Sequence, residues 1–196
     1  MTRLGSVIVA FLLLGSLSGC GINNIPTYEE QAKAAWSQVE SQYQRRADLI
    51  PNLVSTVKGY AAHERDTLEA VVQARAKATS FQAPPDLLTN PEAFRQFQAH
   101  QDQLSSALSR LLVTVERYPD LKANQNFLTL QSQLEGTENR IAVARKDYIE
   151  AVRQYNTEMK TIPGRWWHSW LYPEYEPMPN FSAPEATQAP APQVQF

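Results

Sequence analysis

The sequence predicts an all-α protein: an antiparallel four-helix bundle of long helices, followed by an irregular C-terminal tail rich in proline and tryptophan. Apolar residues recur at three- and four-residue spacing over most of the chain, and no segment alternates with period two for long enough to form a strand. Only Gly59, Gly136 and Gly164 lie beyond residue 21, which leaves little material for hairpin turns. Four helices that are each apolar on one side bury those sides most economically as an antiparallel bundle.

The first predicted helix begins at Tyr28. Arg46 takes a place in its stripe where an apolar residue is expected. Pro51 lies within the segment and lacks a backbone N–H, so we predict a kink between Asp48 and Pro51. Gly59 marks the predicted break. The apolar stripe consists of Ala32, Trp36, Val39, Tyr43, Ile50, Leu53, Val57 and Tyr60.

The second predicted helix covers residues 63–79 and ends before Pro84-Pro85, which cannot continue a helix. Arg75 lies close to its apolar stripe. The third opens at Asn90-Pro91, with asparagine as the cap and proline at the first helical position, and runs to Tyr118. Its three-four spacing is uninterrupted.

The fourth predicted helix covers residues 120–162 and would be about 60 Å long at 1.5 Å per residue. From Pro163 onward lie seven of the thirteen prolines, so residues 163–196 are predicted to form no helix. Trp166, Trp167 and Trp170 lie in this tail. We expect them to contact one end of the bundle or the bilayer interface, where amphipathic rings are favoured.

The N-terminus carries the features of a secretory signal. Arg3 precedes the apolar run Val7–Leu14, which is too short to span a membrane, and small residues follow it. Leu17-Ser18-Gly19-Cys20 resembles the lipobox of bacterial lipoproteins, which implies acylation of Cys20, the only cysteine, after cleavage. The alternative is a plain secretory signal or short anchor with an incidental cysteine. Gly21 after the cysteine favours sorting to the outer membrane, facing the periplasm.

Four parts are therefore predicted. Residues 1–19 are a cleaved lipoprotein signal peptide, and residues 20–27 hold the lipidated Cys20 and a short linker. Residues 28–162 form the helical bundle, and residues 163–196 form a tail that packs on the bundle or the membrane surface. Attachment to the membrane is expected through acyl chains on Cys20, because two or three chains hold firmly where one alone binds weakly.

Composition argues against several classes of function. With 18 basic and 20 acidic residues, the chain has a net charge of −2 and no clustered basic stretch, so no nucleic-acid partner is expected. Glycine-rich phosphate-binding motifs are absent from the sequence, so no nucleotide or other cofactor is expected. His63, His100 and His168 are scattered, and His63-Glu64 lacks the second histidine of a zinc-protease helix. We therefore predict no metal site and no catalytic residue.

Two stretches resemble the signatures of the LemA family. The first is Arg45-Arg46-Ala47-Asp48-Leu49-Ile50-Pro51-Asn52-Leu53-Val54, followed by Thr56–Tyr60 and Ala70–Arg75. The second starts at Tyr118-Pro119-Asp120-Leu121-Lys122-Ala123 and continues through Thr137-Glu138-Asn139-Arg140-Ile141-Ala142 to Tyr155-Asn156. The final Ala191–Phe196 is also similar to that family's usual ending.

The resemblance covers nearly all of residues 28–196. It implies a helical bundle held to a bacterial membrane by an N-terminal segment, and it implies no particular biochemical activity. Two departures stand out: most relatives are anchored by a transmembrane helix rather than a lipobox, and Tyr148 is followed by Ile149 where the family has asparagine. Tyr155-Asn156 retains the tyrosine-asparagine pair seven residues later.

Several charged residues lie on or near apolar stripes, where an unpaired charge would be costly. We predict a buried polar network of Arg46, Arg75, Glu135, Glu138 and Arg145, in which the glutamates of the fourth helix pair with Arg46 and Arg75. Such a network can fix the register of the helices, or it can serve in binding.

The function predicted from these observations is that of a non-catalytic binding adaptor or scaffold, anchored by lipid in the cell envelope, with an unidentified protein partner. One alternative is an enzyme, or an activator of an enzyme, that acts on envelope material. Another is a structural protein that assembles with copies of itself, so a homo-oligomer is possible.

Overall fold

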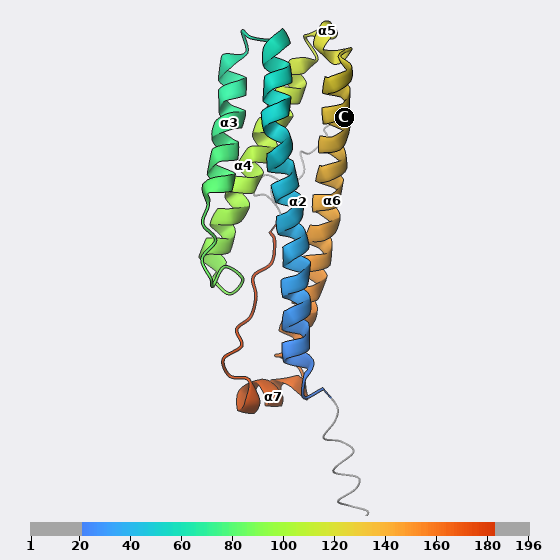
Figure 1. Ribbon diagram of the computed structural model, residues 1–196. Helices are drawn as coiled ribbons and strands as arrows, with labels where there is room; N and C mark the ends of the chain where they lie inside the picture. The colour runs from blue at the N-terminus through green and yellow to red at the C-terminus, as the bar shows by residue number, and fades with distance from the viewer. Residues whose placement is uncertain (1–20, 183–196) are drawn as a thin grey trace, which may run out of the picture.

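The computed structural model describes residues 21–182 as a bundle of long helices (Figure 1). Residues 1–20 and 183–196 lie outside this description, and with them the predicted signal peptide and the Cys20 lipidation site. Within residues 21–182 the regular structure is entirely helical, so the prediction of an all-α bundle is confirmed. No helix in this range combines the length and the apolar character needed to cross a membrane.

Six helices make up the described chain: α2 (Asn24–Tyr60), α3 (Arg65–Ser80), α4 (Pro91–Val115), α5 (Pro119–Lys122), α6 (Gln125–Glu158) and α7 (Gly164–Leu171). α2 starts four residues before the predicted Tyr28, so part of the expected linker is helical, and it continues unbroken through Pro51. The predicted fourth helix is divided into α5 and α6. Asn124 separates the two because its side chain accepts a hydrogen bond from the Phe127 N–H and caps α6.

The start of α4 is placed where the sequence predicts it. The Asn90 side-chain oxygen accepts hydrogen bonds from the N–H groups of Glu92 and Ala93, both at 3.1 Å. Pro91 occupies the first helical position, where its missing N–H would have had no partner within the helix. The Asn90 cap provides acceptors for free N–H groups in the first turn of α4, and Pro91 has no N–H that needs one. Together they fix the residue at which α4 begins.

α2 and α6 lie antiparallel and contact each other along the bundle (Figure 1). At 1.5 Å per residue, their 37 and 34 residues extend about 55 and 51 Å. α3 has only 16 residues, about 24 Å, and packs with α4 on α2 at the end far from residue 21. We call this end distal. The opposite, basal end is where α7 lies across the bundle and where α2 begins.

The prediction that the tail forms no helix is wrong for residues 164–171, which form α7. The prolines flank this segment at Pro163 and Pro173 and leave the residues between them free to form helical hydrogen bonds. After Leu171 the chain turns back along the bundle and has no regular secondary structure up to Ser182. We refer to residues 172–182 as the strap.

The buried apolar side chains form two clusters. The distal cluster joins α2, α3, α4 and α6 through residues such as Leu53, Val71, Leu104, Leu111 and Phe127. The basal cluster joins α2, α4, α6 and the strap through Trp36, Phe94, Phe97, Tyr148, Val152, Tyr155, Met159 and Met178, among others. The strap therefore completes the basal half of the bundle, as α3 completes the distal half.

Candidate functional site

A layer of polar side chains lies at the level between the two apolar clusters. The guanidinium of Arg46, on α2, is only 1% exposed. Its Nη1 donates to Ser105 Oγ at 2.7 Å and to Glu138 Oε1 at 3.0 Å. Its Nη2 donates to Gln101 Oε1 at 2.7 Å and to the Gln101 carbonyl oxygen at 3.3 Å. We call Arg46, Gln101, Ser105 and Glu138 the polar layer.

The polar layer joins three helices through one buried charge. A buried guanidinium is tolerated only when it is paired and hydrogen-bonded, because the loss of hydration costs several kcal/mol. Arg46 obtains its acceptors from α4 and α6, and its guanidinium also lies 5.0 Å from the centroid of the Tyr43 ring. Any shift of α4 or α6 along α2 would remove these acceptors. The polar layer therefore fixes the register of the three helices.

A groove of about 390 Å³ opens between α4 and α6 beside the polar layer. Glu138 connects the two, because its side chain is 41% exposed in the groove while one of its oxygens accepts from buried Arg46. We call this the distal groove. It is lined by Ser105, Leu108, Ser109, Leu112, Leu134, Glu135, Glu138 and Asn139.

The structure brings Arg46 and Glu138 together, but Arg75 does not join them. Arg75 lies on α3, which packs on α2 and α4, whereas both glutamates lie on α6. The Nε of Arg75 instead donates to the Ala47 carbonyl oxygen at 2.8 Å. That carbonyl would accept from the N–H of residue 51 in a regular helix, and residue 51 is proline. Arg75 therefore satisfies the carbonyl that Pro51 leaves without its usual donor.

Replacing Arg75 by alanine is expected to lower the free energy of unfolding by about 1.5 kcal/mol, as is typical when a charged donor is lost. In a Pro51→Ala background the same replacement should cost clearly less, because the N–H of Ala at position 51 can then donate to Ala47. Urea denaturation of the wild type, the two single variants and the double variant gives the coupling between the two sites. Equal costs of Arg75→Ala in both backgrounds would contradict this assignment.

Glu135 and Arg145 also lie outside the polar layer. Glu135 is exposed on the wall of the distal groove and accepts a hydrogen bond from Gln131 Nε2 at 2.9 Å. The guanidinium of Arg145 lies 4.3 Å from the centroid of the Phe181 ring. The predicted five-residue network is thus divided among four places: the polar layer with Arg46 and Glu138, the bond from Arg75 to Ala47, the groove wall with Glu135, and the contact of Arg145 with the strap.

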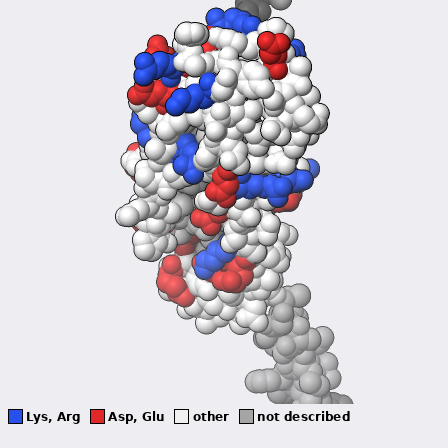
Figure 2. All heavy atoms as spheres, turned by 45° about the horizontal axis from the view of Figure 1, so that its top comes forward, with Lys and Arg blue, Asp and Glu red and all other residues white. Residues whose placement is uncertain are grey.

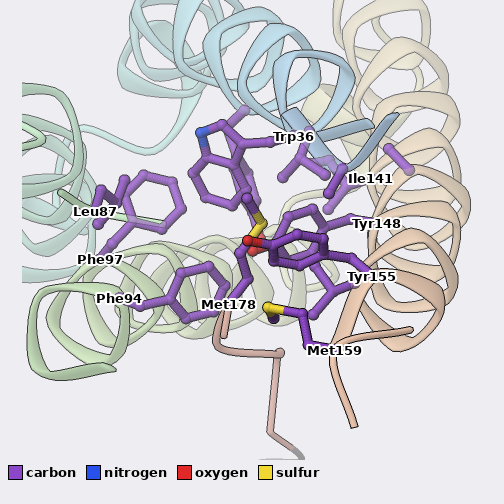
Figure 3. Close-up of a cluster of buried hydrophobic side chains, with 14 of the residues drawn as sticks. Trp36, Leu87, Phe94, Phe97, Ile141, Tyr148, Tyr155, Met159 and Met178 are labelled. Atoms are coloured by element: carbon purple, nitrogen blue, oxygen red, sulfur yellow. The ribbon is translucent and has the colours of Figure 1, made fainter. Parts of the chain in front are cut away.

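Three side chains of α6 hold the strap through hydrogen bonds to its backbone. The hydroxyls of Tyr148 and Tyr155 donate to the carbonyl oxygens of Pro179 and Glu176, at 3.1 and 3.0 Å. Asn156 makes two bonds with the backbone of Met178, donating to its carbonyl oxygen at 2.8 Å and accepting from its N–H at 3.0 Å. Figure 3 shows Met178 among Tyr148, Tyr155 and Met159. The tyrosine-asparagine pair at 155–156 thus fixes the path of the strap.

The basal aromatic side chains pack around Trp36. The Trp36 ring centroid lies 5.2–5.5 Å from those of Phe94, Phe97 and Tyr148, and 6.1 Å from that of Phe181 in the strap. Burial raises the pKa of the Tyr148 hydroxyl well above its usual value. The pKa of the Tyr155 hydroxyl is also raised, and burial is the largest cause. A tyrosine hydroxyl is protonated at neutral pH even at its usual pKa, and the raised pKa keeps both hydroxyls protonated, as donors to the strap, into alkaline solution.

Sequence reasoning missed these strap contacts. The positions of Tyr148 and Tyr155 predict buried rings, but the spacing along one helix does not identify the groups that accept hydrogen bonds from their hydroxyls. The signal was available in Asn156, since an amide beside a buried tyrosine calls for a backbone partner. Its partner lies 22 residues away along the chain.

The tryptophans of α7 differ in their surroundings. Trp167 is partly buried against the basal cluster, whereas Trp166 and Trp170 are 51% and 74% exposed. The sequence predicts that these residues contact either one end of the bundle or the bilayer interface, and Trp167 contacts the bundle. Trp166 and Trp170 are not part of the basal cluster, and half or more of each is exposed.

Charged side chains of both signs are interspersed on the face drawn in Figure 2, with wide areas of uncharged residues between them. Among the described residues, several charged side chains form ion pairs within one turn of a helix, such as Arg153 with Glu150. Among the residues that the structure describes, no three His, Cys, Asp or Glu side chains gather where they could hold a metal ion.

Comparisons with known proteins agree on one family. A model described as the LemA family matches residues 35–196. Magnetosome proteins MamQ 2 and MamQ 1 of Paramagnetospirillum magneticum are each 26% identical over 157 residues, which cover 72% of this chain and 58% of theirs. Protein LemA of Metamycoplasma hominis is 22% identical over 140 residues, 71% of this chain and 60% of its own length. This chain spans less than two thirds of these relatives.

Proposed function

Because the chain belongs to the LemA family, we propose that it is a non-catalytic adaptor of a bacterial cell envelope, anchored by acyl chains on Cys20 and facing the periplasm from the outer membrane. It binds a protein partner in the distal groove between α4 and α6. The lipobox-like Leu17-Ser18-Gly19-Cys20 supports the anchor, and α2 begins only four residues after Cys20. Acyl chains there would hold the basal end at the membrane.

The observation that carries the proposal is the distal groove. Its walls combine three leucine side chains, from Leu108, Leu112 and Leu134, with the carboxylates of Glu135 and Glu138. Apolar side chains with a few well-placed polar groups are typical of a binding groove. The polar layer makes the groove rigid, because Glu138 is held by buried Arg46.

The side chains that line the groove indicate which side chains a bound segment of the partner should carry. Its lining contains two carboxylates and no basic side chain. Arg46 balances the charge of Glu138 from below, which leaves Glu135 on the wall without a cation among the residues lining the groove. A segment that places leucine-like side chains between α4 and α6 and a lysine or arginine beside Glu135 would be complementary to it.

Photo-crosslinking in cells tests this proposal. A photoreactive amino acid at Ser109, on the wall of the groove, is expected to give one discrete crosslinked complex with another envelope protein. Glu135→Lys should reduce its yield at least about tenfold, because it reverses the charge that the partner's cation meets. Glu69→Lys is the matched control: Glu69 is also exposed and bonds a glutamine four residues away, but it lies on α3.

Three results would contradict the proposal. Equal loss of the complex in both lysine variants would show a general effect of charge. A complex made of two copies of this chain would favour self-assembly instead. Crosslinks confined to residues 183–196 of the same chain would show that the protein's own C-terminus occupies the groove. Metabolic labelling with palmitate tests the anchor separately, and Cys20→Ser should abolish that label.

A further inference from the structure

α7 and the turn before it carry exposed apolar side chains at the basal end. Ile162, Trp166 and Trp170 follow one another at four-residue intervals and are 66%, 51% and 74% exposed, and Leu171 is 48% exposed. Within α7 the four-residue spacing places Trp166 and Trp170 on the same side of the helix, whereas Ile162 lies in the turn before it. We call Ile162, Trp166, Trp170 and Leu171 the basal apolar face.

The position of α7 is fixed by the bundle. Trp167 packs against the basal cluster, and a side-chain nitrogen of His168 lies 2.9 Å from the Tyr175 carbonyl oxygen in the strap. A Cβ atom at Gly164 would collide with the carbonyl oxygen of Glu158, so glycine is needed for this close approach. The exposure of Trp166 and Trp170 is therefore a consequence of rigid packing on the opposite side of α7.

The basal apolar face lies at the end where the N-terminal segment leaves the bundle. Gly21 lies next to Asn24 and close to the side chain of Glu158, and Asn24 Nδ2 donates to Glu158 Oε1 at 3.0 Å. The Tyr172 hydroxyl, directly after α7, donates to Asn23 Oδ1 at 3.3 Å. The described chain thus begins at Gly21, beside α7 (Figure 1).

Basic side chains accompany this face. Lys160 and Arg165 are exposed on either side of Ile162, and neither forms an ion pair with another residue in the range 21–182. α7 itself contains no acidic residue. Tryptophan is favoured at the level of lipid headgroups, and cations nearby attract anionic lipids.

We infer that the basal apolar face lies in the interface of the membrane to which the chain is anchored, so that the bundle stands on the bilayer with α7 parallel to its surface. This inference rests on the membrane anchoring in the proposed function. It adds a second point of contact, which would fix the direction of the distal groove away from the lipid. A lipid surface is the occupant because Cys20, the acylated residue of the proposed function, directly precedes Gly21 at this end of the molecule.

The experiment uses quenching of tryptophan fluorescence by brominated lipid. The processed chain, residues 20–196 without acylation, is coupled through its only cysteine, Cys20, to a maleimide-bearing lipid in vesicles of phosphatidylcholine and phosphatidylglycerol. With brominated acyl chains, up to roughly half of the emission should be lost relative to ordinary vesicles, since two of the four tryptophans would contact lipid. The double variant Trp166→Phe/Trp170→Phe keeps an apolar face but should lose nearly all of this quenching.

A Trp36→Phe variant is the matched control, because Trp36 is buried in the basal cluster and should not contribute to the quenching. The inference would be overturned if brominated vesicles did not reduce the emission of the tethered wild type. It would also be overturned if they reduced the emission of the double variant by the same fraction as that of the wild type. The coupling step holds the chain on the vesicle whether or not cells acylate Cys20. Failure of the anchor would therefore appear only in the palmitate labelling, and failure of the basal contact only in the quenching.

Discussion

Replacing Glu138 by leucine is expected to lower the free energy of unfolding by about 3 kcal/mol, because it leaves the buried guanidinium of Arg46 without its counter-charge. Arg46 is 1% exposed and cannot recover its hydration without opening the bundle. The remaining acceptors, Gln101 and Ser105, are neutral. For a chain of this size the loss corresponds to a fall in Tm of about 6–12 °C, measurable by circular dichroism.

Two further variants separate loss of the buried ion pair from a general effect. Adding Arg46→Met to Glu138→Leu should restore most of the stability, because an apolar side chain of similar length needs no partner. Glu150→Leu is the matched control on the same helix: Glu150 pairs with Arg153 at the surface, and its loss should leave the Tm unchanged. If Glu138→Leu and Glu150→Leu melted alike, the polar layer would have no role in stability.

Removing the two apolar anchors of the strap should have an effect of similar size. The double variant Met178→Ala/Phe181→Ala is expected to lose about 4 kcal/mol, the usual range for large core side chains cut to alanine, reduced because Phe181 is only half-buried. The cost arises because Trp36, Phe94 and Tyr148 lose the contacts that cover them. Thermal denaturation measures the total loss.

Hydrogen exchange shows where the strap variant is weakened. Amide protection in residues 148–155 of α6 should fall more than protection in residues 127–134, which belong to the distal half. Trp170→Ala serves as the control, because it removes a larger side chain from an exposed site and should change stability little. Equal melting of the two variants would mean that the strap only lies on the bundle without stabilising it.

Much of the fold follows from local features of the sequence. The three-four spacing places the long helices, and Asn90-Pro91 fixes the start of α4 because cap and proline act within one turn. The spacing also places Arg46 on the apolar stripe of α2 and Glu138 beside the stripe of α6, so that each is a natural partner of the other. Their pairing could therefore be predicted before the arrangement of the helices was known.

The remaining contacts depend on which helices are neighbours, and a stripe does not contain that information. Arg75 is correctly placed near a stripe, but α3 packs away from the glutamates of α6, and the orphaned carbonyl of Ala47 lies closer. α7 has eight residues and lies between prolines, so its periodicity is too short to distinguish from an irregular tail. The strap has no periodicity at all and is defined only by contacts made over long sequence separations.

The division of the bundle between α3 and the strap has a consequence for the order in which the chain matures. The distal half is built from residues up to Leu134, so it can close as soon as that much of the polypeptide has emerged. The basal half cannot, since Met178 and Phe181 come near the end of synthesis. Until they arrive, Trp36 and Phe94 lack the side chains of the strap that cover them, which makes the basal half of the bundle the last to mature.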